Sequence, residues 1–457
     1  MYIDLIAPKT SNTSVPKSKD AKAVYIETYG CQMNVADSEI VASIMSSAGF
    51  FMTENIDESN VILLNTCSVR DNAEKKIFNR LKQLRGLKRR KNKKLVVGIL
   101  GCMAERLKGN LIGERDLVSI VVGPDEYRNI PALVNEAFAG EQGIAVKLSK
   151  VETYEDIVPL RTQGISAWLS IMRGCNNFCA FCVVPYTRGR ERSRTLNSVV
   201  DEVKHLYDSG IKEVTLLGQN VNSYFDKEYK HDFPKLLAEC AKAVPNMRIR
   251  YTTSHPHDMS DGLIEAHATY KNICDYIHLP VQSGSSDVLK KMRRDYDREK
   301  YLRRIEAIRK QVPDVALSTD IISGFCYETE EDHRETLSLM AEVRYDGAYM
   351  FKYSERDNTL AVKYEDTVSE EDKTRRLQEI IDQQHKISAE INLTEHGRVH
   401  EVLVEGVSKK NENEWQGRTD TNKVAIFTHT DDIKVGDLIN VKVTGSTSAT
   451  LFTDVIR

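Results

Sequence analysis

The sequence predicts an α/β protein made of three parts: an amino-terminal parallel α/β domain, a central partial barrel of six strand–helix units, and a small carboxyl-terminal β-barrel. Three observations predict this class. Strand and helix patterns alternate in residues 23–145, further strand–helix units follow in residues 166–368, and only short alternating strands divided by glycines occupy residues 397–457. The length of 457 residues agrees, because it corresponds to about three domains of roughly 150 residues each.

Three other segments connect or precede these parts. Residues 1–22 are rich in Ser, Lys, Pro, Thr and Asp without periodicity, which predicts a flexible leader. Residues 146–165 have weak periodicity and contain Pro159 and Gly164, as expected of a linker. Residues 369–396 form one long helical pattern with an apolar stripe, which we expect to connect the central barrel to the last module.

The composition excludes several classes of protein. The formal net charge is -3 with 29% charged residues, so any nucleic-acid partner must bind local patches rather than a generally basic surface. The nine cysteines are an odd number, and several stand beside glycines in expected loops, which indicates metal ligation in a reducing compartment rather than disulfides. No apolar run approaches the length of a membrane span. We therefore expect a soluble cytoplasmic protein with no membrane partner.

Cysteines follow three buried strands of the amino-terminal domain. The strands are expected at residues 23–29, 61–65 and 95–100, with helices at residues 38–49 and 71–90 between them. In a parallel sheet all strand carboxyl ends lie on one edge, where ligands bind. The cysteines that follow the strands are Cys31, Cys67 and Cys102.

Three cysteines at equivalent strand ends can hold an iron–sulfur cluster, with one iron left without a protein thiolate. The alternative is that all three are buried small hydrophobic residues, which is common for a single cysteine. We favour the cluster because the three positions are equivalent in the predicted topology.

A second set of cysteines has the spacing C-x3-C-x2-C and consists of Cys175, Cys179 and Cys182. These residues also supply three thiolates where a four-iron cluster has four corners, so one iron again stays open. A structural zinc site is the alternative, but such sites usually have four closed ligands, often as two C-x2-C pairs, and no second pair lies nearby. The spacing therefore favours a cluster.

The cysteine loop follows the first strand of the central part. Strands are expected at residues 167–172, 213–217, 247–252, 276–279, 315–322 and 347–351, and helices at residues 196–209, 232–243, 260–270, 297–311 and 330–344. Active sites of such barrels lie at the carboxyl ends of the strands. Glycines, amides and hydroxyls that suit a bound ribose and carboxylate follow there, at residues 218–224, 254–256 and 280–285.

The C-x3-C-x2-C spacing, with Phe181 before the last cysteine, resembles the radical S-adenosylmethionine superfamily. The resemblance implies a 4Fe-4S cluster whose open iron binds S-adenosylmethionine and whose electron cleaves the sulfonium bond to give a 5'-deoxyadenosyl radical. It makes the three cysteines of the motif the catalytic residues. It also implies cofactor contacts from Phe181, Gln219, Ser254, Gln282 and Gly324.

The amino-terminal motifs are similar to those of the methylthiotransferase family. The matching stretches are Gly30-Cys31-Gln32-Met33-Asn34, Asp37-Ser38-Glu39, Asn65-Thr66-Cys67-Ser68-Val69-Arg70 and Gly101-Cys102-Met103-Ala104. Within the family, the stretch after Cys31 resembles the branch that modifies isopentenyladenosine 37 of transfer RNA. This resemblance implies methylthiolation at C2 of the base. Sulfur would come from a second 4Fe-4S cluster on the strand-end cysteines, and the methyl group from a second S-adenosylmethionine.

Three alternatives remain open. Other branches of the family act on threonylcarbamoyladenosine 37 of transfer RNA or on a ribosomal protein aspartate, and they usually carry a different residue pair after the first cysteine. A noncatalytic iron–sulfur RNA-binding sensor would need fully ligated clusters, whereas both sets here are one thiolate short. The main interpretation implies as partners the anticodon stem-loop of transfer RNA, an electron donor such as flavodoxin or ferredoxin, and iron–sulfur assembly proteins.

One turn departs from the family pattern. Where the family typically has Gly-Phe-Pro-Gly-Glu, this chain has Gly324-Phe325-Cys326-Tyr327-Glu328, which changes a turn that the resemblance places beside the adenine pocket. Cys326 has no partner at ligand spacing, and neither do Cys240 and Cys274, so we expect all three to be structural.

Basic residues in three places are candidates for RNA contact. Four arginines directly after the cluster motif suit phosphate and base contacts: Arg188, Arg190, Arg192 and Arg194. A basic run between Lys82 and Lys94 suits either a solvated helix end or phosphate contact. The strands after residue 398 resemble the TRAM module, an RNA-binding barrel. Because this module has no basic excess, RNA binding by it would rely on Lys409, Lys410, Arg418 and Lys423.

Overall fold

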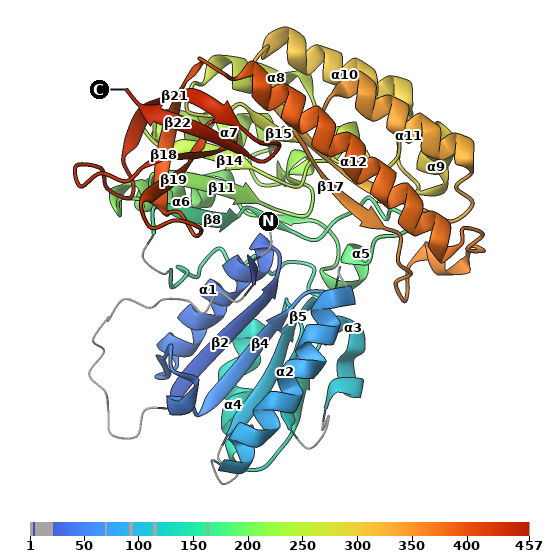
Figure 1. Ribbon diagram of the computed structural model, residues 1–457. Coiled ribbons are helices and arrows are strands. Elements are labelled where there is room, and N and C mark those ends of the chain that lie inside the picture. The colour runs from blue at the N-terminus through green and yellow to red at the C-terminus, as the bar shows by residue number, and fades with distance from the viewer. Residues whose placement is uncertain are drawn as a thin grey trace.

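The computed structural model describes residues 3–4, 22–68, 71–90, 95–112, 117–161 and 164–456. Its ribbon shows three parts (Figure 1): an amino-terminal α/β domain (blue), a central arc of strands with helices outside it, and a small β-barrel (red) that packs on the central part. This architecture confirms the predicted fold class. No helix in the described ranges combines the length and apolar character needed to cross a membrane.

The amino-terminal sheet has the strand order β1-β2-β4-β5-β6-β7, with β3 paired to β2. All neighbours are parallel except β1, which pairs antiparallel with β2. Fully buried apolar runs form β4 and β5, as expected of strands covered on both faces. The strands are β1 (Ile3–Asp4), β2 (Ala23–Gly30), β3 (Phe51–Met52), β4 (Val61–Thr66), β5 (Val96–Gly101), β6 (Val118–Val122) and β7 (Gly143–Ala145).

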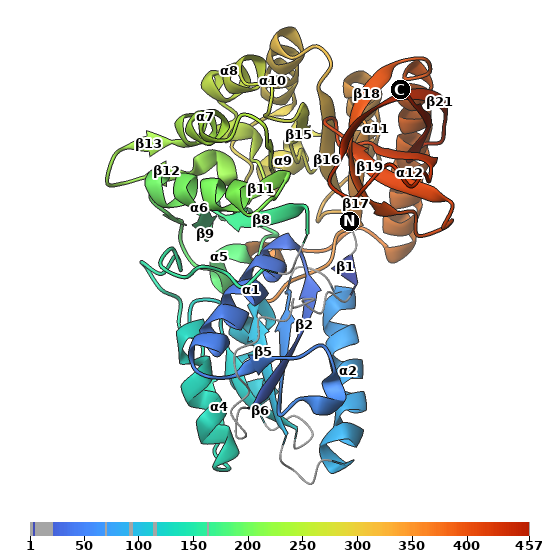
Figure 2. The same ribbon diagram turned by 90° about the vertical axis from the view of Figure 1, so that its left-hand side faces the viewer.

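Helices cover both faces of this sheet (Figure 2). One apolar core lies between the sheet and α1 with α4, and a second lies between the sheet and α2 with α3. The helices are α1 (Gln32–Ser47), α2 (Asp71–Arg90), α3 (Cys102–Leu107) and α4 (Ile130–Phe138).

Several elements of this domain differ from expectation. The first helix begins six residues earlier than the apolar pattern indicates, because its first two turns bury polar side chains such as Asn34 and Asp37. The strands β6 and β7 were not predicted. Most of the expected leader lies outside the described residues, and the part that is described, β1, is paired to the sheet.

The central part contains six parallel strands in two groups, ordered β14-β11-β8 and β15-β16-β17. A bridge between Ile249 and Ile273 links the two groups into one arc. The strands are β8 (Ser166–Ser170), β11 (Glu213–Leu217), β14 (Arg248–Tyr251), β15 (Tyr276–His278), β16 (Ala316–Ser323) and β17 (Gly347–Lys352). Short antiparallel pairs flank the arc: β9 (Met172–Arg173) with β10 (Arg192–Ser193), and β12 (Phe225–Asp226) with β13 (His231–Asp232).

Helices pack outside the arc and bury the main core of the molecule against its strands. They are α6 (Leu196–Asp208), α7 (Phe233–Ala243), α8 (Asp261–Thr269), α9 (Ser286–Lys291), α10 (Arg298–Gln311) and α11 (Glu330–Val343). The short helix α5 (Val184–Thr187) instead lies beside α3 at the junction with the amino-terminal domain (Figure 1). Side chains alternate across each strand, so Ile249 and Tyr251 of β14 enter this core while Arg248 and Arg250 lie on the opposite face.

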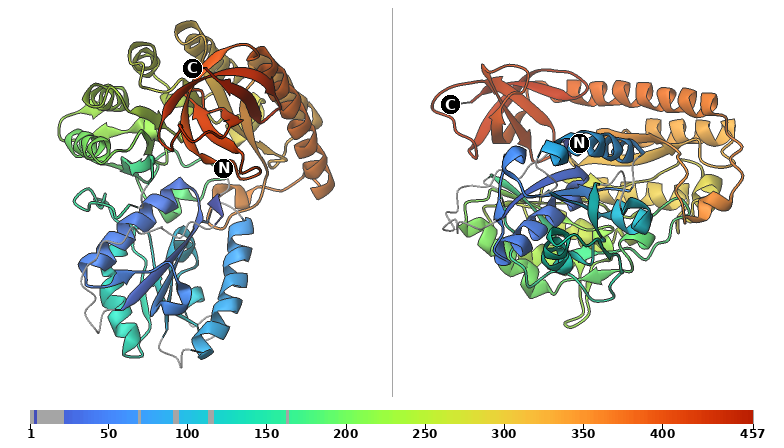
Figure 3. Two further views of the ribbon diagram at one scale, coloured as in Figure 1. Left: turned by 60° about the vertical axis from the view of Figure 1, so that its left-hand side comes forward. Right: turned by 90° about the horizontal axis from the view of Figure 1, so that it is seen from below.

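The long helix α12 (Glu370–Thr394) runs along the central part into the last module (Figure 3). That module is a closed barrel with the order β18-β19-β20-β22-β21. Arg250 anchors it, because its guanidinium donates to the carbonyls of Thr419 (2.7 Å) and Asp420 (2.6 Å). The strands are β18 (Val399–Val407), β19 (Glu414–Thr419), β20 (Val424–Thr428), β21 (Leu438–Ser446) and β22 (Thr450–Val455).

Candidate iron–sulfur and cofactor site

The three strand-end cysteines lie on neighbouring strands of the amino-terminal sheet. Cys31 caps α1 directly after β2, Cys67 follows β4, and Cys102 begins α3 directly after β5. Glycines bring these ends together. A Cβ atom on Gly30 would lie 2.5 Å from Cβ of Cys67, and one on Gly101 would lie 2.6 Å from Oδ1 of Asn65, so larger residues would push the strand ends apart.

A buried amide network fixes the rim between Cys31 and Cys67. Asn34 Nδ2 donates to Asn65 Oδ1 (3.1 Å) and to the carbonyl of Thr66 (3.1 Å), while Cys31 Sγ donates to Asn34 Oδ1 (3.3 Å). Because Asn34 and Asn65 are fully buried and bonded to each other, they hold the first turn of α1 against the end of β4. The motif residues around the cysteines therefore shape the rim.

The thiols of this set differ in their readiness to ionise. A hydrogen bond with Cys67 and the nearby Arg188 guanidinium lower the pKa of Cys31 to about 6. Burial raises the pKa of Cys102, although Arg188 opposes this effect because its Nε donates to Cys102 Sγ at 3.2 Å. Thiolates are the form that binds metal, so a cation at the rim favours the ligating state.

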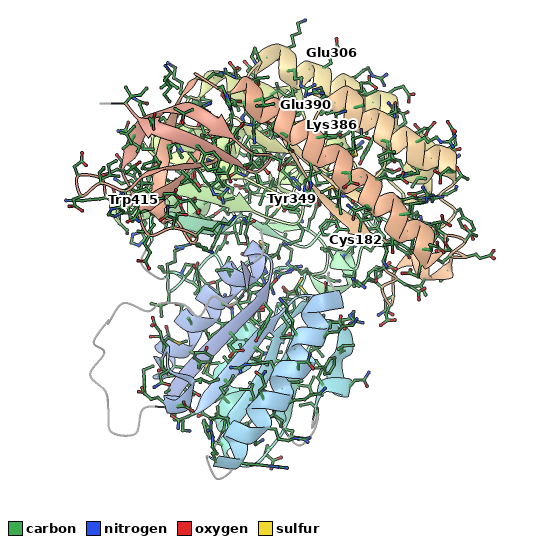
Figure 4. All side chains as sticks on the ribbon, in the orientation of Figure 1. Cys182, Glu306, Tyr349, Lys386, Glu390 and Trp415 are labelled. Carbon is green, nitrogen blue, oxygen red and sulfur yellow. The ribbon has the colours of Figure 1, made fainter. Side chains whose placement is uncertain are left out.

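The C-x3-C-x2-C loop leaves β9 and is held from several sides. Gly174 has φ +79 and donates to Gln219 Oε1 (2.5 Å), and a Cβ atom on it would lie 2.1 Å from the carbonyl of Arg190. Further along, Ala180 N–H donates to the carbonyl of Met292 (2.9 Å). Figure 4 places Cys182 at the junction of the central part with the amino-terminal domain. The second cysteine set therefore lies where the two domains meet.

Burial raises the pKa of Cys175 to about 12 and also raises that of Cys182. Bare thiols in this loop thus favour the protonated state. Arg294 supplies a compensating charge, because its Nη1 donates to Cys179 Sγ (3.3 Å) while Nε and Nη2 are bonded to Tyr296 Oη and the carbonyl of Pro280. Each cysteine set therefore has one arginine in contact with a thiol.

Unpartnered polar atoms gather at the carboxyl ends of the barrel strands. Buried atoms without a hydrogen-bond partner among the described residues include Gln219 Nε2, Asn220 Oδ1, Asn222 Nδ2 and Oδ1, Ser254 Oγ, His255 Nε2 and Ser323 Oγ. They follow β11 and β14 or end β16. Buried polar groups in native proteins are nearly always bonded, so this cluster fits a polar ligand such as S-adenosylmethionine.

His255 adds a donor that the sequence analysis did not single out. Burial, Arg294 and His257 lower its pKa to about 2, so the ring is neutral. Its Nδ1 accepts from the amide of His257 (3.3 Å), which leaves the proton on the unpartnered Nε2. His255 thus offers a buried neutral N–H donor next to Ser254 after the end of β14.

The other expected cofactor residues lie around the same rim. Gln282 has φ +73 and bridges to β16 through Ile321, while Phe181 packs edge-on against Phe325. Gly324 allows α12 to pack closely, because a Cβ atom at this position would lie 2.3 Å from Cγ of Lys373 on that helix.

Hydrogen bonds fix the turn at residues 324–328, although its sequence departs from the family pattern. Gly324 N–H donates to Glu328 Oε1 (3.0 Å), and this bond does not require a Pro-Gly pair. Tyr327 stands where the family pattern has glycine and adopts φ +63, and its hydroxyl accepts from the amide of Glu365 (2.8 Å). Cys240, Cys274 and Cys326 are all buried. Cys240 lies in the main apolar core, Cys274 near Arg250 and Glu213, and Cys326 in a smaller apolar cluster that also contains Ala180 of the cysteine loop.

Three of the four arginines expected to contact RNA are buried and paired to acids within the chain. Arg188 binds Asp37, Arg192 binds Asp125 (2.7 Å), and Arg194 binds Glu202 (2.6 Å). The pairs of Arg188 and Arg192 cross the junction of the domains, whereas that of Arg194 lies within the central part. The expected clamp of four arginines is therefore not available as predicted, and of the four only Arg190 is exposed. Arg190 is exposed, and its guanidinium stacks 4.3 Å from the centre of the Phe178 ring.

The four basic residues of the TRAM-like module that were expected to contact RNA also fall into two groups, one paired within the chain and one exposed. Arg418 pairs with Glu405 (3.0 Å) and Lys423 with Asp346 (2.7 Å), so both have partners inside the chain. Lys409 and Lys410 are exposed. Part of the basic run near the end of α2, residues 91–94, lies outside the described residues.

No group of three or more His, Cys, Asp or Glu side chains in the described ranges is arranged to hold a single metal ion. A four-iron cluster places each thiolate on a different iron, so it needs the cysteines around a larger body than one ion. The two triads and their arginines fit such a group in ligand type and number.

Comparisons with known proteins agree with these parts. Residues 23–123 match the model of uncharacterized protein family UPF0004, residues 169–340 the radical SAM superfamily, and residues 393–456 the TRAM domain. Among solved structures, the radical S-adenosylmethionine methyltransferase TsrM from Kitasatospora setae has a TM-score of 0.54 at 14% identity, covering 73% of this chain and 75% of that chain. The cobalamin-dependent S-adenosylmethionine radical enzyme OxsB has a TM-score of 0.51 at 11% identity, covering 80% of this chain and 56% of that chain. At these identities the likeness shows the fold alone.

Curated relatives are much more similar. The tRNA-2-methylthio-N(6)-dimethylallyladenosine synthase of Parabacteroides distasonis is 57% identical over 438 residues, covering 95% of each chain. The protein of the same name from Chloroherpeton thalassium is 54% identical over 429 residues, covering 94% of this chain and 95% of that protein. Identity at this level over nearly the whole length shows that the chain belongs to the tRNA-2-methylthio-N(6)-dimethylallyladenosine synthase family.

Proposed function

We propose that this protein is a transfer RNA methylthiotransferase that converts N6-isopentenyladenosine 37 to its 2-methylthio derivative by radical sulfur insertion and methyl transfer. The observation that carries the proposal is the pairing of two cysteine triads, each one thiolate short of a closed four-iron cluster, in two domains that are locked together at one junction. Family membership at 57% identity supports the same reaction.

Each triad would hold one 4Fe-4S cluster, and S-adenosylmethionine would occupy the strand ends with the unpartnered polar atoms. A cluster held by Cys175, Cys179 and Cys182 would supply the electron that cleaves the sulfonium bond, and one held by Cys31, Cys67 and Cys102 would supply the sulfur. We assign this chemistry to residues 23–145 and 166–368.

The chain's own residues bind and orient the reactants. Ser254 Oγ and His255 Nε2 present a hydroxyl and a neutral N–H donor to the cofactor position, and Gln219 ties the amide of Gly174 to the end of β11 so that the cysteine loop keeps its place. Burial of these groups excludes water, which strengthens each hydrogen bond to the ligand. Arg294 offsets the negative charge of the Cys179 thiolate.

The RNA substrate would approach at the exposed edge of the cysteine loop. Arg190 and Phe178 form a stacked pair there, and the Tyr186 ring lies edge-on to Phe178 at 5.9 Å. Aromatic rings and guanidinium groups stack on unpaired bases, and anticodon-loop bases can be splayed out of their stack. Lys409 and Lys410 in residues 397–457 would add phosphate contacts.

The remaining partners follow from this chemistry. The reaction needs an electron donor of low potential, such as flavodoxin or ferredoxin, and iron–sulfur assembly proteins to load the triads. Because transfer RNA is the proposed substrate, we place the activity in the cytoplasm.

Two measurements test the proposal. Iron and sulfide are measured per chain after anaerobic reconstitution, for the wild type and a variant with Cys175, Cys179 and Cys182 changed to Ala. We expect about eight irons to fall to about four. Four falling to none would remove the second cluster and with it the sulfur source.

The substrate is tested by nucleoside analysis of transfer RNA from cells that lack their own synthase and express this chain. Appearance of the 2-methylthio derivative of isopentenyladenosine is expected. A methylthio derivative of threonylcarbamoyladenosine or of a ribosomal aspartate would transfer the chain to one of the other branches. Failure to cleave S-adenosylmethionine when reduced would leave an iron–sulfur RNA-binding sensor.

A further inference from the structure

Arg188 joins the two domains directly at the strand-end cysteines. It follows α5 of the central part, yet both groups that it contacts through side chains belong to the amino-terminal domain. Its Nε donates to Cys102 Sγ at 3.2 Å, and its Nη2 donates to Asp37 Oδ2 at 2.8 Å. The side chain is only 4% exposed. A charged donor from one domain is thus buried in the cysteine rim of the other.

One donor nitrogen of Arg188 has nothing to bond. Nη1 is buried and has no hydrogen-bond partner among the described residues. Buried N–H groups without an acceptor are rare in native proteins, and a charged one is costly. Nε of the same guanidinium reaches Cys102 Sγ, so the open donor belongs to a group that lies at the cysteine rim. An acceptor placed in that rim would complete its bonding.

Pairing with Asp37 alone does not explain this arrangement. Asp37 Oδ1 already accepts from Arg173 Nη1 (2.8 Å), and its Oδ2 also accepts from Tyr127 Oη (3.2 Å). A purely structural partner for Asp37 could direct both terminal nitrogens at the carboxylate. Arg188 instead donates from Nε to sulfur and keeps Nη1 without a partner among the described residues.

We propose that Arg188 is a positioning residue for the auxiliary iron–sulfur centre, donating hydrogen bonds from the central barrel to sulfur atoms of that centre and raising its reduction potential. This inference rests on the proposed function, which places a cluster on Cys31, Cys67 and Cys102. Hydrogen bonds to cluster sulfur and nearby positive charge stabilise the more negative, reduced state. The auxiliary centre is therefore complete only when the two domains are docked.

The first test detects the native Arg188 guanidinium at the cluster directly, in a chain from which the other cysteine set has been removed. The full chain carrying Cys175, Cys179 and Cys182 changed to Ala is reconstituted, and its guanidinium groups are labelled with ¹⁵N. Pulsed electron paramagnetic resonance of the reduced cluster should show a ¹⁵N coupling, which Arg188→Lys should abolish. A cluster that contains about four irons but shows no such coupling would overturn the role of Arg188. Absence of any cluster in this chain would instead refute the proposed function.

The second test measures the midpoint potential of the same cluster. Arg188→Gln removes the charge and should shift the midpoint to more negative values, whereas Arg188→Lys keeps the charge and should shift it less. Arg194→Gln is the matched control, because Arg194 is also buried, lies in the same segment and pairs with Glu202 without touching a cysteine. An Arg188→Gln chain with full iron content and the control's midpoint would also overturn the proposal.

Discussion

Asp37 Oδ1 lies 2.8 Å from Nη1 of Arg173, and both side chains are almost completely buried. This pair ties α1, which starts at the first strand-end cysteine, to the strand that leads into the second cysteine loop. Burial favours the neutral carboxyl, but Arg173 and Arg188 outweigh it and hold the pKa of Asp37 below its usual range. This buried ion pair therefore joins α1, beside the strand-end cysteines, to β9, which precedes the C-x3-C-x2-C loop.

Replacing Asp37 by Asn should separate the two domains. The change removes the counter-charge of buried Arg188 and leaves Arg173 with Asp125 alone, at 3.7 Å. Removing one partner of a buried pair costs about 3–5 kcal/mol. Hydrogen exchange should show faster opening of α1 and of the segment around Arg173. Asp201→Asn is the control, because Asp201 is 73% exposed in a surface pair with Lys204 and should change little. Equal protection in both variants would contradict this account of the junction.

Gly174→Ala should remove the cluster of the central part. A methyl group at this position meets the carbonyl of Arg190 at 2.1 Å, and the backbone has φ +79, so the loop must move. We expect the iron content to fall from about eight to about four per chain, with the amino-terminal cluster retained. Gly210→Ala provides the control: Gly210 has φ +90 but nothing within 4 Å, so the variant carries backbone strain alone. Full iron content in Gly174→Ala would show that the loop tolerates displacement.

The stability of the apo chain should fall as pH rises from about 4.5 to about 7. Burial raises the pKa of Glu39 to about 7, although Arg161 opposes this effect. Between pH 4.5 and about pH 7, Glu39 keeps its proton in the folded chain but has lost it in the unfolded chain. The free energy of unfolding therefore decreases as pH rises through this range. Glu39→Gln should remove about 3 kcal/mol of this dependence, as judged from urea unfolding at several pH values. An unchanged pH profile in the variant would exclude Glu39 as the source.

Arg250→Met should loosen the carboxyl-terminal barrel. The guanidinium bonds two carbonyls of that barrel and Glu213 of β11 (2.8 Å), and the loss leaves these buried acceptors unsatisfied. Limited proteolysis should then cut the chain near the end of α12 several times faster than in the wild type. Arg304→Met serves as the control, because Arg304 pairs with the exposed Asp261 far from the barrel. Equal cleavage rates would mean that other contacts hold the module.

Lys409→Ala combined with Lys410→Ala should weaken RNA binding at low salt. If both lysines contact phosphates, the slope of log affinity against log salt should fall by about 2. Lys434→Ala is a useful comparison, since Lys434 is exposed on the same barrel beside Asp437. A slope equal to that of the wild type would assign RNA binding to other residues.

Local patterns sufficed for β2, β4 and β5 and for the cysteine rim. Residues 61–64 of β4 are an uninterrupted apolar run, and a cysteine after each of three parallel strands must reach the same edge. The early start of α1 was not predictable, because its first turns bury polar residues that show no apolar period. The short strand β7 carries no alternation that distinguishes it from linker.

The arginine segment shows the limit of sequence reasoning about the site. Four arginines spaced by single residues look the same whether they face phosphate or buried acids. Their partners, Asp37, Asp125 and Glu202, lie on elements of different domains or later helices, and only tertiary docking brings them together. The contact of Arg188 with Cys102 spans 86 positions and leaves no local signal.

That separation along the chain has a consequence for biosynthesis. As the protein leaves the ribosome, the three amino-terminal cysteines appear well before Arg173 and Arg188 have been made. Their sheet can form early, since its strands pair among themselves, but Asp37 lacks both cationic partners until the segment through Arg192 has emerged and docked. The rim at Cys31, Cys67 and Cys102 is thus completed only after the central domain has been translated, and loading of the proposed cluster should follow that step rather than occur on a nascent or truncated chain.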